Sequence, residues 1–212
     1  IQDPENQKRI LLIEPPYYRL FKNSYSLDRY PLSLGYLAGT IKKDTDWDVR
    51  VYNADFSSQS EWVKVSYLAS DGYYNYLENL KDLSKPIWRE IESAISEYNP
   101  TVIGISTKSQ NFTSASIVAK IAKEVNKQII VIVGGPHPSM VGVDVLKFPD
   151  IDVSVKGEGE ITVVELLNAI GNHKNYSDID GISYRNNNRY IDNSPREYIK
   201  DLDSLCFPNE NA

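Results

Sequence analysis

Four short loops hold most of the residues in this 212-residue chain that could take part in binding or chemistry. Each follows a run of β-branched residues and is rich in glycine, proline or hydroxyl groups. In chain order the loops are Pro15-Pro16-Tyr17-Tyr18, Ser106-Thr107-Lys108-Ser109, Gly134-Gly135-Pro136-His137-Pro138-Ser139 and Gly157-Glu158-Gly159-Glu160. Glycine lets a ligand approach bare backbone, and hydroxyl groups bind amide, ribose or phosphate groups. These residue types favour a binding site, and we assign none of them a catalytic role.

Two of the loops also have ordinary structural explanations. Gly134-Gly135 can form a plain strand-to-helix turn. Pro136 and Pro138 stiffen that loop more than a turn requires, which favours a functional role for the loop. Ser106 and Thr107 can hold a ligand or can satisfy neighbouring backbone groups before a helix. The sequence leaves both interpretations of the hydroxyl groups open.

The loop Gly157-Glu158-Gly159-Glu160 does not match the glycine fingerprint of dinucleotide-binding folds. The third glycine position is Thr162, the loop follows the fifth strand rather than the first, and two glutamates would meet a pyrophosphate. The carboxylates can instead favour the start of a helix or accept hydrogen bonds from ribose or amide groups. Structure alone explains Glu160 more easily than Glu158.

His137 is the ionisable residue at the centre of the glycine-proline loop. As a metal ligand it would be a single imidazole, because the other histidine, His173, lies in a distant polar stretch. We therefore favour a hydrogen-bonding or positioning role over metal ligation. Cys206 is the single cysteine, so this chain alone forms neither an internal disulfide nor a multi-cysteine metal site, and a reducing cytoplasm fits.

Short β-branched runs alternate with stretches of helical period, which predicts an α/β fold with a parallel sheet covered on both faces. The expected strands are 9–14, 48–53, 101–106, 128–133 and 152–156. Apolar spacing predicts helices around 34–41, 87–95 and 117–125, and the T-x-x-E spacing of Thr162 and Glu165 predicts a capping box for a fourth helix. In doubly wound sheets ligands bind beyond the carboxyl ends of the strands, where all four loops fall.

Three segments fall outside this alternation. Residues 57–86 form an insertion with an expected helix around Trp62 to Leu68. Residues 181–191 flank an asparagine turn and predict a β-hairpin. Residues 193–212 have no sustained period, so we expect a domain over 1–192 followed by a linker. The tyrosines of the insertion are expected mainly to form a packed surface layer, with a substrate or domain contact as the alternative: Tyr67, Tyr73, Tyr74 and Tyr76.

Composition excludes several classes of protein. The chain has 23 Lys and Arg against 29 Asp and Glu, and its net charge of -6 repels nucleic acid and anionic lipid surfaces. Its longest aliphatic run, 129–133, is far below the roughly 18 residues of a membrane span. No P-loop, G-x-S-x-G or H-E-x-x-H motif occurs. We therefore expect a soluble protein without a nucleic-acid or membrane partner.

Taken in order, a set of motifs resembles the N-terminal cobalamin-binding domain of radical S-adenosylmethionine enzymes. That family includes cobalamin-dependent methylases and the anaerobic magnesium-protoporphyrin monomethyl ester cyclase. The match covers about 9–170, and residues 181–191 and 199–205 look like the family's hairpin and its bridge into a catalytic barrel. The motifs are Pro31-Leu32-Ser33-Leu34-Gly35-Tyr36-Leu37-Ala38, Val102-Ile103-Gly104-Ile105-Ser106, Val133-Gly134-Gly135-Pro136-His137-Pro138-Ser139 and Gly157-Glu158-Gly159-Glu160.

The resemblance implies a flavodoxin-like, Rossmann-like sheet of five parallel strands in the order 2-1-3-4-5, followed by the hairpin. Cobalamin would be the cofactor, with its corrin over the carboxyl edge and its nucleotide tail among the loops. Similar domains carry a D-x-H-x-x-G loop for the lower ligand of cobalt, whereas Glu14 to Arg19 contain no histidine. The resemblance thus implies a detached benzimidazole and no protein ligand to the metal. The implied cofactor-binding residues are Pro15, Ser106, Thr107, Gly134, Gly135, Pro136, His137, Gly157, Glu158 and Gly159.

The chain departs from the radical enzymes because it lacks their C-x-x-x-C-x-x-C triplet. S-adenosylmethionine and the iron–sulfur cluster would then belong to an absent C-terminal catalytic domain, and we favour a non-catalytic excised domain over a free-standing cobalamin carrier. One alternative is a nucleotide-binding or sugar-transfer domain that uses Gly134-Gly135 for phosphate, with Lys108 and Lys156 as the nearby cations. A signalling receiver domain would need an acidic pair after the first strand, where Glu14 is followed by two prolines.

Overall fold

The structure, a computed structural model, describes residues 8–27, 29–187, 189–209 and 212. The strands are β1 (Arg9–Glu14), β2 (Asp48–Asn53), β3 (Val102–Ser106), β4 (Ile130–Gly134), β5 (Val153–Val155), β6 (Ile182–Asn186) and β7 (Arg189–Asp192). The helices are α1 (Tyr18–Phe21), α2 (Leu32–Asp44), α3 (Val65–Leu68), α4 (Asp71–Lys81), α5 (Pro86–Tyr98), α6 (Phe112–Val125), α7 (Pro136–Val141) and α8 (Glu160–Gly171). Short 3₁₀ turns are η2 (Ser109–Asn111), η3 (Gly142–Lys147) and η4 (Leu202–Ser204). None of the described helices is long and apolar enough to cross a membrane.

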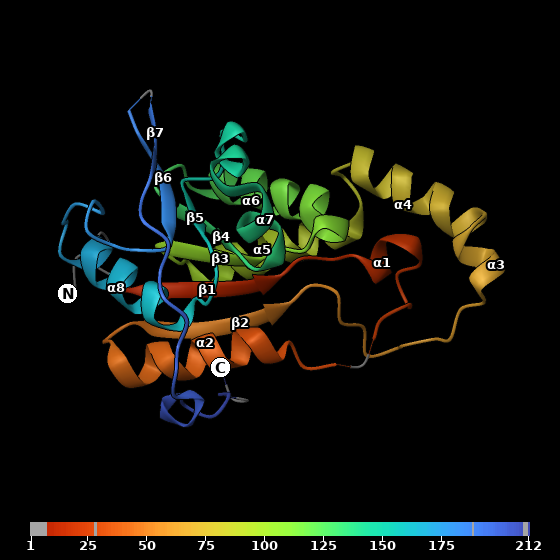
Figure 1. The fold of residues 1–212 in the computed structure, drawn as a ribbon. Coiled ribbons are helices and arrows are strands. Elements are labelled where there is room, and N and C mark those ends of the chain that lie inside the picture. Colours follow the sequence, from red (N-terminus) through yellow and green to blue (C-terminus); the bar gives the residue numbers. More distant parts are fainter. Residues whose placement is uncertain (1–7, 28, 188, 210–211) are drawn as a thin grey trace.

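The strands form one sheet in the order β2-β1-β3-β4-β5-β6-β7, with helices on both faces (Figure 1). β1 to β5 pair in parallel in the expected order 2-1-3-4-5, and every predicted strand is found within two residues of its expected ends. The sequence predicted five strands in this sheet, and the structure has seven. β6 pairs antiparallel with β5, so the predicted hairpin extends the same sheet and covers its open edge. Asn187 has the positive φ that the turn requires, and Asn188 lies outside the described residues.

Strand side chains alternate between two cores, one on each face of the sheet. Leu11 and Ile103 belong to the core that α5 and α6 cover. Ile10 and Val102, one position earlier on the same strands, face α2 and α8. Because β1 to β5 run in the same direction, their carboxyl ends and the loops that follow lie along one edge of the sheet.

α8 begins three residues earlier than the sequence predicted. Gly159 is at its N-cap and Glu160 opens the helix, where a carboxylate suits the positive end of the helix dipole. The predicted capping box at Thr162 is therefore wrong. The Thr162 hydroxyl lies inside the first turn, donates to the carbonyl of Glu158 at 3.5 Å and accepts from the Arg196 Nε–H at 2.8 Å.

The insertion contains two helices where one was expected. α3 starts at Val65, so the predicted helical start at Trp62 is wrong, and the Trp62 side chain is 92% exposed. Figure 1 shows α4 reaching beyond the carboxyl end of β1, beside α1. Sequence reasoning missed α4 because its tyrosines and asparagines have modest helix propensity and it buries just one residue, Gly72.

Candidate functional site

The loops after β3 and β4 are bonded directly to each other at the carboxyl edge. Ser106 and Gly134 are cross-strand partners. The buried Thr107 donates both its N–H, at 2.7 Å, and its hydroxyl, at 3.0 Å, to the carbonyl of Gly134. Gly135 has φ 107° and ψ -167°, and a Cβ there would come within 2.7 Å of the Thr107 carbonyl oxygen. The Thr107 hydroxyl thus stabilises the contact between the two loops, whereas the Ser106 side chain is half-buried at the edge.

His137 is held on three sides by these loops. Its N–H donates to the Thr107 carbonyl at 3.2 Å, and its Nδ1 lies 3.1 Å from Ser109 Oγ. Its ring packs on Phe112 with 4.1 Å between the ring centroids. Burial lowers the pKa of His137, which favours the neutral form of the imidazole. Within the part of the chain that the structure describes, no group of three His, Cys, Asp or Glu side chains is placed to hold a metal ion.

An ion pair joins the ends of β1 and β3. Glu14 Oε1 lies 2.8 Å from Lys108 Nζ, and the Glu14 side chain is 15% exposed. The buried Pro15-Pro16 that follows is fixed because the Ser114 hydroxyl donates to the Pro16 carbonyl at 2.6 Å. A cavity of about 380 Å³ opens beside this pair, between the ends of β1 and β2 and the start of α2.

The loop after β5 is tied to the loop after β4 and to the C-terminal segment. Ser139 Oγ donates to the Gly135 carbonyl and accepts from the Gly157 N–H, both at 2.9 Å. Sequence reasoning placed Ser139 in the loop but did not foresee this bridge. The Glu158 carboxylate accepts from the backbone N–H of Ile199 at 2.6 Å, so its nearest donor is the chain itself and Glu158 has a structural partner.

Small residues line the carboxyl edge on the face that α2 and α8 cover. Ser106 and Gly134 follow Val102 and Ile132 at even spacing and therefore share the face of those core residues. A Cβ on Gly134 would have Val155 Cβ at 3.8 Å as its nearest neighbour, which is ordinary contact. We call this region the α2–α8 slot.

The mouth of the slot is narrow. Gly159 at the start of α8 faces Leu37 of α2, and a Cβ on Gly159 would come within 3.3 Å of Leu37 Cδ2. Leu37 was not among the predicted site residues, although it stands in one of the recognised motifs. At this end of the slot, the bare backbone of Gly159 therefore lies next to the Leu37 side chain.

Asp55 is a half-buried carboxylate beside the site that sequence reasoning missed. It follows β2 and accepts the backbone N–H groups of Tyr17 at 2.7 Å and Arg19 at 3.1 Å, which fixes the loop after β1. The Arg19 side chain, 7% exposed, donates to the Ala54 carbonyl and pairs with Glu90 at 2.8 Å. The signal that could have found Asp55 is its position, because it follows a parallel strand as the four loops do.

The charge of Asp55 should make stability depend on pH. Burial raises the pKa of Asp55 to about 6, and the N–H groups of Tyr17 and Arg19 partly oppose this rise. A carboxyl with a raised pKa binds its proton more tightly in the folded state than in the unfolded state. The stabilisation of the fold by that proton is therefore lost as the pH rises through 6. We expect wild type to lose about 2 kcal/mol of stability relative to Asp55→Asn between pH 4 and pH 7.5. Urea unfolding of both proteins at these two pH values measures the difference.

The matched control is Asp44→Asn at the exposed end of α2. Its stability difference from wild type should stay constant over the same range. A constant difference for Asp55→Asn as well would show that Asp55 is charged at the same pH in the folded and unfolded states.

The tyrosines of the insertion divide into two groups. Tyr76 stacks on Phe21 with 4.8 Å between the ring centroids, and the Tyr67 hydroxyl donates to the Phe21 carbonyl at 3.0 Å. Tyr73 and Tyr74 are 49% and 69% exposed. The packed layer expected from the sequence therefore forms between α1 and the helices α3 and α4, and two of the four tyrosines remain open to solvent.

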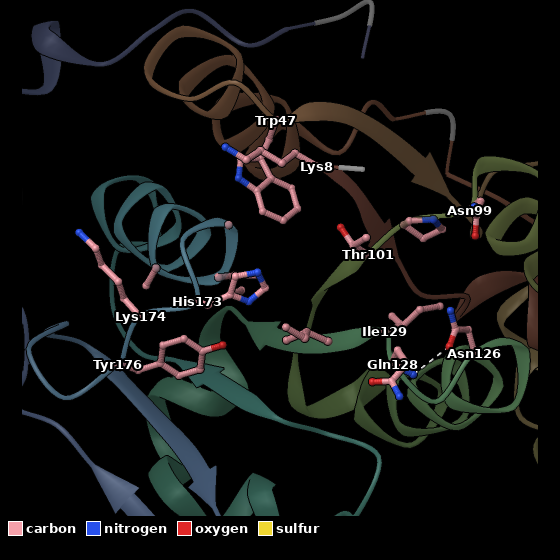
Figure 2. Close-up of a pocket in the computed structure, with 15 residues that line it drawn as sticks. Lys8, Trp47, Asn99, Thr101, Asn126, Gln128, Ile129, His173, Lys174 and Tyr176 are labelled. Atoms are coloured by element: carbon pink, nitrogen blue, oxygen red, sulfur yellow. Dashed lines mark hydrogen bonds between the residues drawn. The ribbon is translucent and has the colours of Figure 1, made fainter. Parts of the chain in front are cut away.

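A second cavity, of about 710 Å³, lies at the opposite, amino-terminal edge of the sheet. Figure 2 shows Trp47, His173 and Tyr176 on one side of it and the amide side chains of Asn126 and Gln128 on the other. None of the residues predicted to bind the cofactor lines this cavity. It also lies away from the edge where parallel strands place their ligand-binding loops, so the carboxyl edge remains the candidate site.

The two lysines that the sequence offered to the phosphate-binding alternative are both ion-paired. Lys108 is paired with Glu14, and Lys156 is paired with Asp192. Both lysines that the sequence offered for a nucleotide phosphate are therefore used within the fold.

Comparison with known proteins shows what the chain is similar to. The family model described as the B12 binding domain matches residues 18–167. An uncharacterized methyltransferase, PH0819, of Pyrococcus horikoshii is 29% identical over 202 residues, covering 95% of this chain and 38% of the relative. The anaerobic magnesium-protoporphyrin IX monomethyl ester cyclase of Synechocystis sp. is 27% identical over 199 residues, covering 92% and 34%. The chain thus spans little more than a third of the length of these relatives.

The fold is also shared with a solved structure. The radical S-adenosylmethionine methyltransferase TsrM of Kitasatospora setae, solved with cobalamin and a [4Fe-4S] cluster bound, superposes with a TM-score of 0.59. The two sequences are 14% identical over 95% of this chain and 31% of TsrM. At that identity the likeness concerns the fold alone.

Proposed function

The chain belongs to the B12-binding domain family, and from this premise we propose that its carboxyl-edge loops hold cobalamin with the nucleotide tail in the α2–α8 slot. The observation that carries the proposal is the row of small residues on one face of the edge. Ser106 and Gly134 at the strand ends and Gly159 at the start of α8 present a hydroxyl group and bare backbone there. A Cβ on Gly134 would point into the space that the tail takes.

The residues present fit this cofactor. Corrin side chains are neutral amides, and the nucleotide tail carries a single phosphodiester charge. The edge offers hydroxyl and backbone groups to match amides, while its lysines at 108 and 156 are neutralised by carboxylates. Gly135 and Gly157 both have positive φ, which glycine adopts without strain.

We propose that cobalamin binds here with its benzimidazole detached and without a protein ligand to cobalt. Similar domains supply a histidine from the loop after β1. Here that loop begins with two prolines, directly after Glu14 and its ion pair with Lys108. His137 has its Nδ1 against Ser109 and its ring against Phe112, which supports a positioning role. When bound, cobalamin supplies a cobalt centre suited to methyl transfer or related radical chemistry.

We also propose that the chain is the non-catalytic, cobalamin-holding part of a longer radical S-adenosylmethionine enzyme. The support is its coverage of the two relatives, one called a methyltransferase and the other a cyclase. S-adenosylmethionine and an iron–sulfur cluster would be bound by a second, C-terminal domain. The single cysteine of the chain supports the cytoplasm as its compartment.

The test is retention of hydroxocobalamin by the purified chain. After mixing and gel filtration, we expect the protein peak to carry corrin with a base-off absorbance spectrum. Gly134→Val should abolish retention while leaving the fold intact, because β4 tolerates a β-branched residue and the added methyl groups fill the slot. The control is Tyr190→Val on the edge strand β7, which should retain corrin as wild type does.

Two outcomes would contradict parts of the proposal. Corrin that elutes apart from a folded wild-type chain would exclude cobalamin binding by this domain. A spectrum typical of histidine ligation, lost in His137→Ala, would preserve cobalamin binding but contradict the absence of a protein ligand.

A further inference from the structure

The C-terminal segment 193–209 crosses α8 and then α2, and we call it the strap. Figure 1 shows it descending from the hairpin past both helices. It starts where Asn193 Nδ2 donates to the carbonyls of Tyr176, at 2.7 Å, and Ile179, at 2.8 Å. The Gly181 N–H donates to the Ser194 carbonyl at 2.7 Å. These contacts attach the start of the strap to the sheet domain.

The middle of the strap is attached to α8 and to the loop that precedes it. Arg196 donates through Nε to the Thr162 hydroxyl at 2.8 Å and forms an ion pair with Glu165. The Ile199 N–H donates to the Glu158 carboxylate at 2.6 Å. The strap is therefore bonded to the Gly157-Glu158-Gly159 loop that forms one wall of the slot mouth.

The end of the strap lies against α2, the other wall. The Asn209 N–H donates to the Gly35 carbonyl at 3.0 Å, and the Tyr30 hydroxyl donates to the Asn209 carbonyl at 2.6 Å. A Cβ on Gly39 would come within 2.5 Å of the Phe207 carbonyl oxygen. Gly39 therefore lets the strap backbone lie directly on the helix, whereas Gly35 leaves room for the Tyr30 ring.

A cavity of about 360 Å³ lies under the strap between α2 and α8. Its lining includes Thr40 from α2, Val164 from α8, and Ile199 and Leu205 from the strap. The two helices do not fill this space themselves, so strap side chains bridge them. The strap thus contacts both helices that form the walls of the slot, and these helices also pack on each other in one core.

We propose that Glu158 is a positioning residue that ties the strap across the α2–α8 slot, so that cobalamin affinity depends on residues 193–209. This inference rests on the proposed function, because it concerns the same slot. The carboxylate is the acceptor that joins loop and strap.

The first test is Gly39→Ala, which acts on the strap from the far side of the slot. Alanine raises the helix propensity of α2 by about 1 kcal/mol, so the helix itself is not weakened. The new Cβ must displace the Phe207 carbonyl, and the strap should lift from α2. We expect faster amide hydrogen exchange over 199–209 and a dissociation constant for hydroxocobalamin raised about tenfold, the equivalent of one charge-assisted hydrogen bond. Lys42→Ala, on the exposed face of the same helix, should change neither.

The second test is at Glu158. Glu158→Ala removes the acceptor and should reproduce both effects of Gly39→Ala, whereas Glu158→Gln keeps an acceptor oxygen and should restore most of the affinity and the slow exchange. A direct ligand role for the carboxylate would contradict the inference, and it would weaken binding in Glu158→Ala while Gly39→Ala bound hydroxocobalamin as tightly as wild type. Faster strap exchange with an unchanged dissociation constant would overturn the inference and leave the proposed function standing. A folded wild-type chain without affinity for hydroxocobalamin would overturn both.

Discussion

Gly135→Ala should lower the free energy of unfolding by about 3 kcal/mol and abolish corrin retention, although it adds a single methyl group. The native φ of 107° with ψ of -167° lies in a region that glycine alone occupies comfortably. The added Cβ would also lie 2.7 Å from the Thr107 carbonyl oxygen, which is backbone and cannot rotate away. The loops after β3 and β4 would have to separate. Urea unfolding measures the first effect, and gel filtration with hydroxocobalamin measures the second.

The adjacent glycine provides the control for this prediction. Gly134 has ordinary strand geometry, and a Cβ there meets Val155 Cβ at 3.8 Å. Gly134→Ala should therefore change stability by no more than about 0.5 kcal/mol. Equal losses of stability in both alanine variants would show that the backbone conformation of Gly135 is not what demands glycine. Full stability in Gly135→Ala would contradict the contact between the two loops.

The fold could be predicted from the sequence because its signals are local. β-branched runs such as 130–133 and apolar spacing such as Ile87, Ile91 and Ile95 report directly on a strand or a helix face. The carboxyl-edge loops then follow from topology, since parallel strands bring their ends together. The predicted start of α8 was less accurate, because its N-cap residue, Gly159, has no side chain that could form a capping hydrogen bond.

The cross-links of the candidate site could not be predicted in the same way. Asp55 holds the loop after β1 from a position 38 residues from Tyr17, and Glu158 holds Ile199 from 41 residues away. Such pairs depend on three-dimensional packing, and one sequence contains no periodicity that reports them. Ser139 is a partial success: the sequence motif places it in the loop after β4, but its hydrogen bond with Gly157 depends on how the two loops pack.

The insertion also depends on packing rather than on local signals. Trp88 of α5 is 1% exposed and lies in the core that α5 and α6 share. Its indole N–H donates to the Asn79 carbonyl of α4 at 2.7 Å, and Asn79 Nδ2 donates to the Leu20 carbonyl of α1 at 2.8 Å. One core side chain thus connects the insertion to the loop that follows β1 and borders the candidate site.

Trp88→Ala should lower the free energy of unfolding by about 4 kcal/mol. The truncation leaves a cavity in the core, and it removes the donor for the Asn79 carbonyl. The loss of stability should spread from the core to the insertion helices α3 and α4. Amide exchange over 65–81 should therefore accelerate more than exchange in α8. Denaturant unfolding gives the total effect, and hydrogen exchange followed by mass spectrometry gives its distribution.

Two further variants separate the causes of this effect. Trp88→Phe keeps most of the packing and loses the indole donor, so it should cost about 1 to 2 kcal/mol and still loosen α4. Trp62→Ala makes the comparable change at a side chain that is 92% exposed, and it should cost less than about 0.5 kcal/mol. Similar losses at positions 62 and 88 would mean that burial does not distinguish the two tryptophans. A destabilised Trp88→Ala with unchanged exchange in α4 would instead show that the insertion is held by its tyrosine contacts with α1, independently of the core.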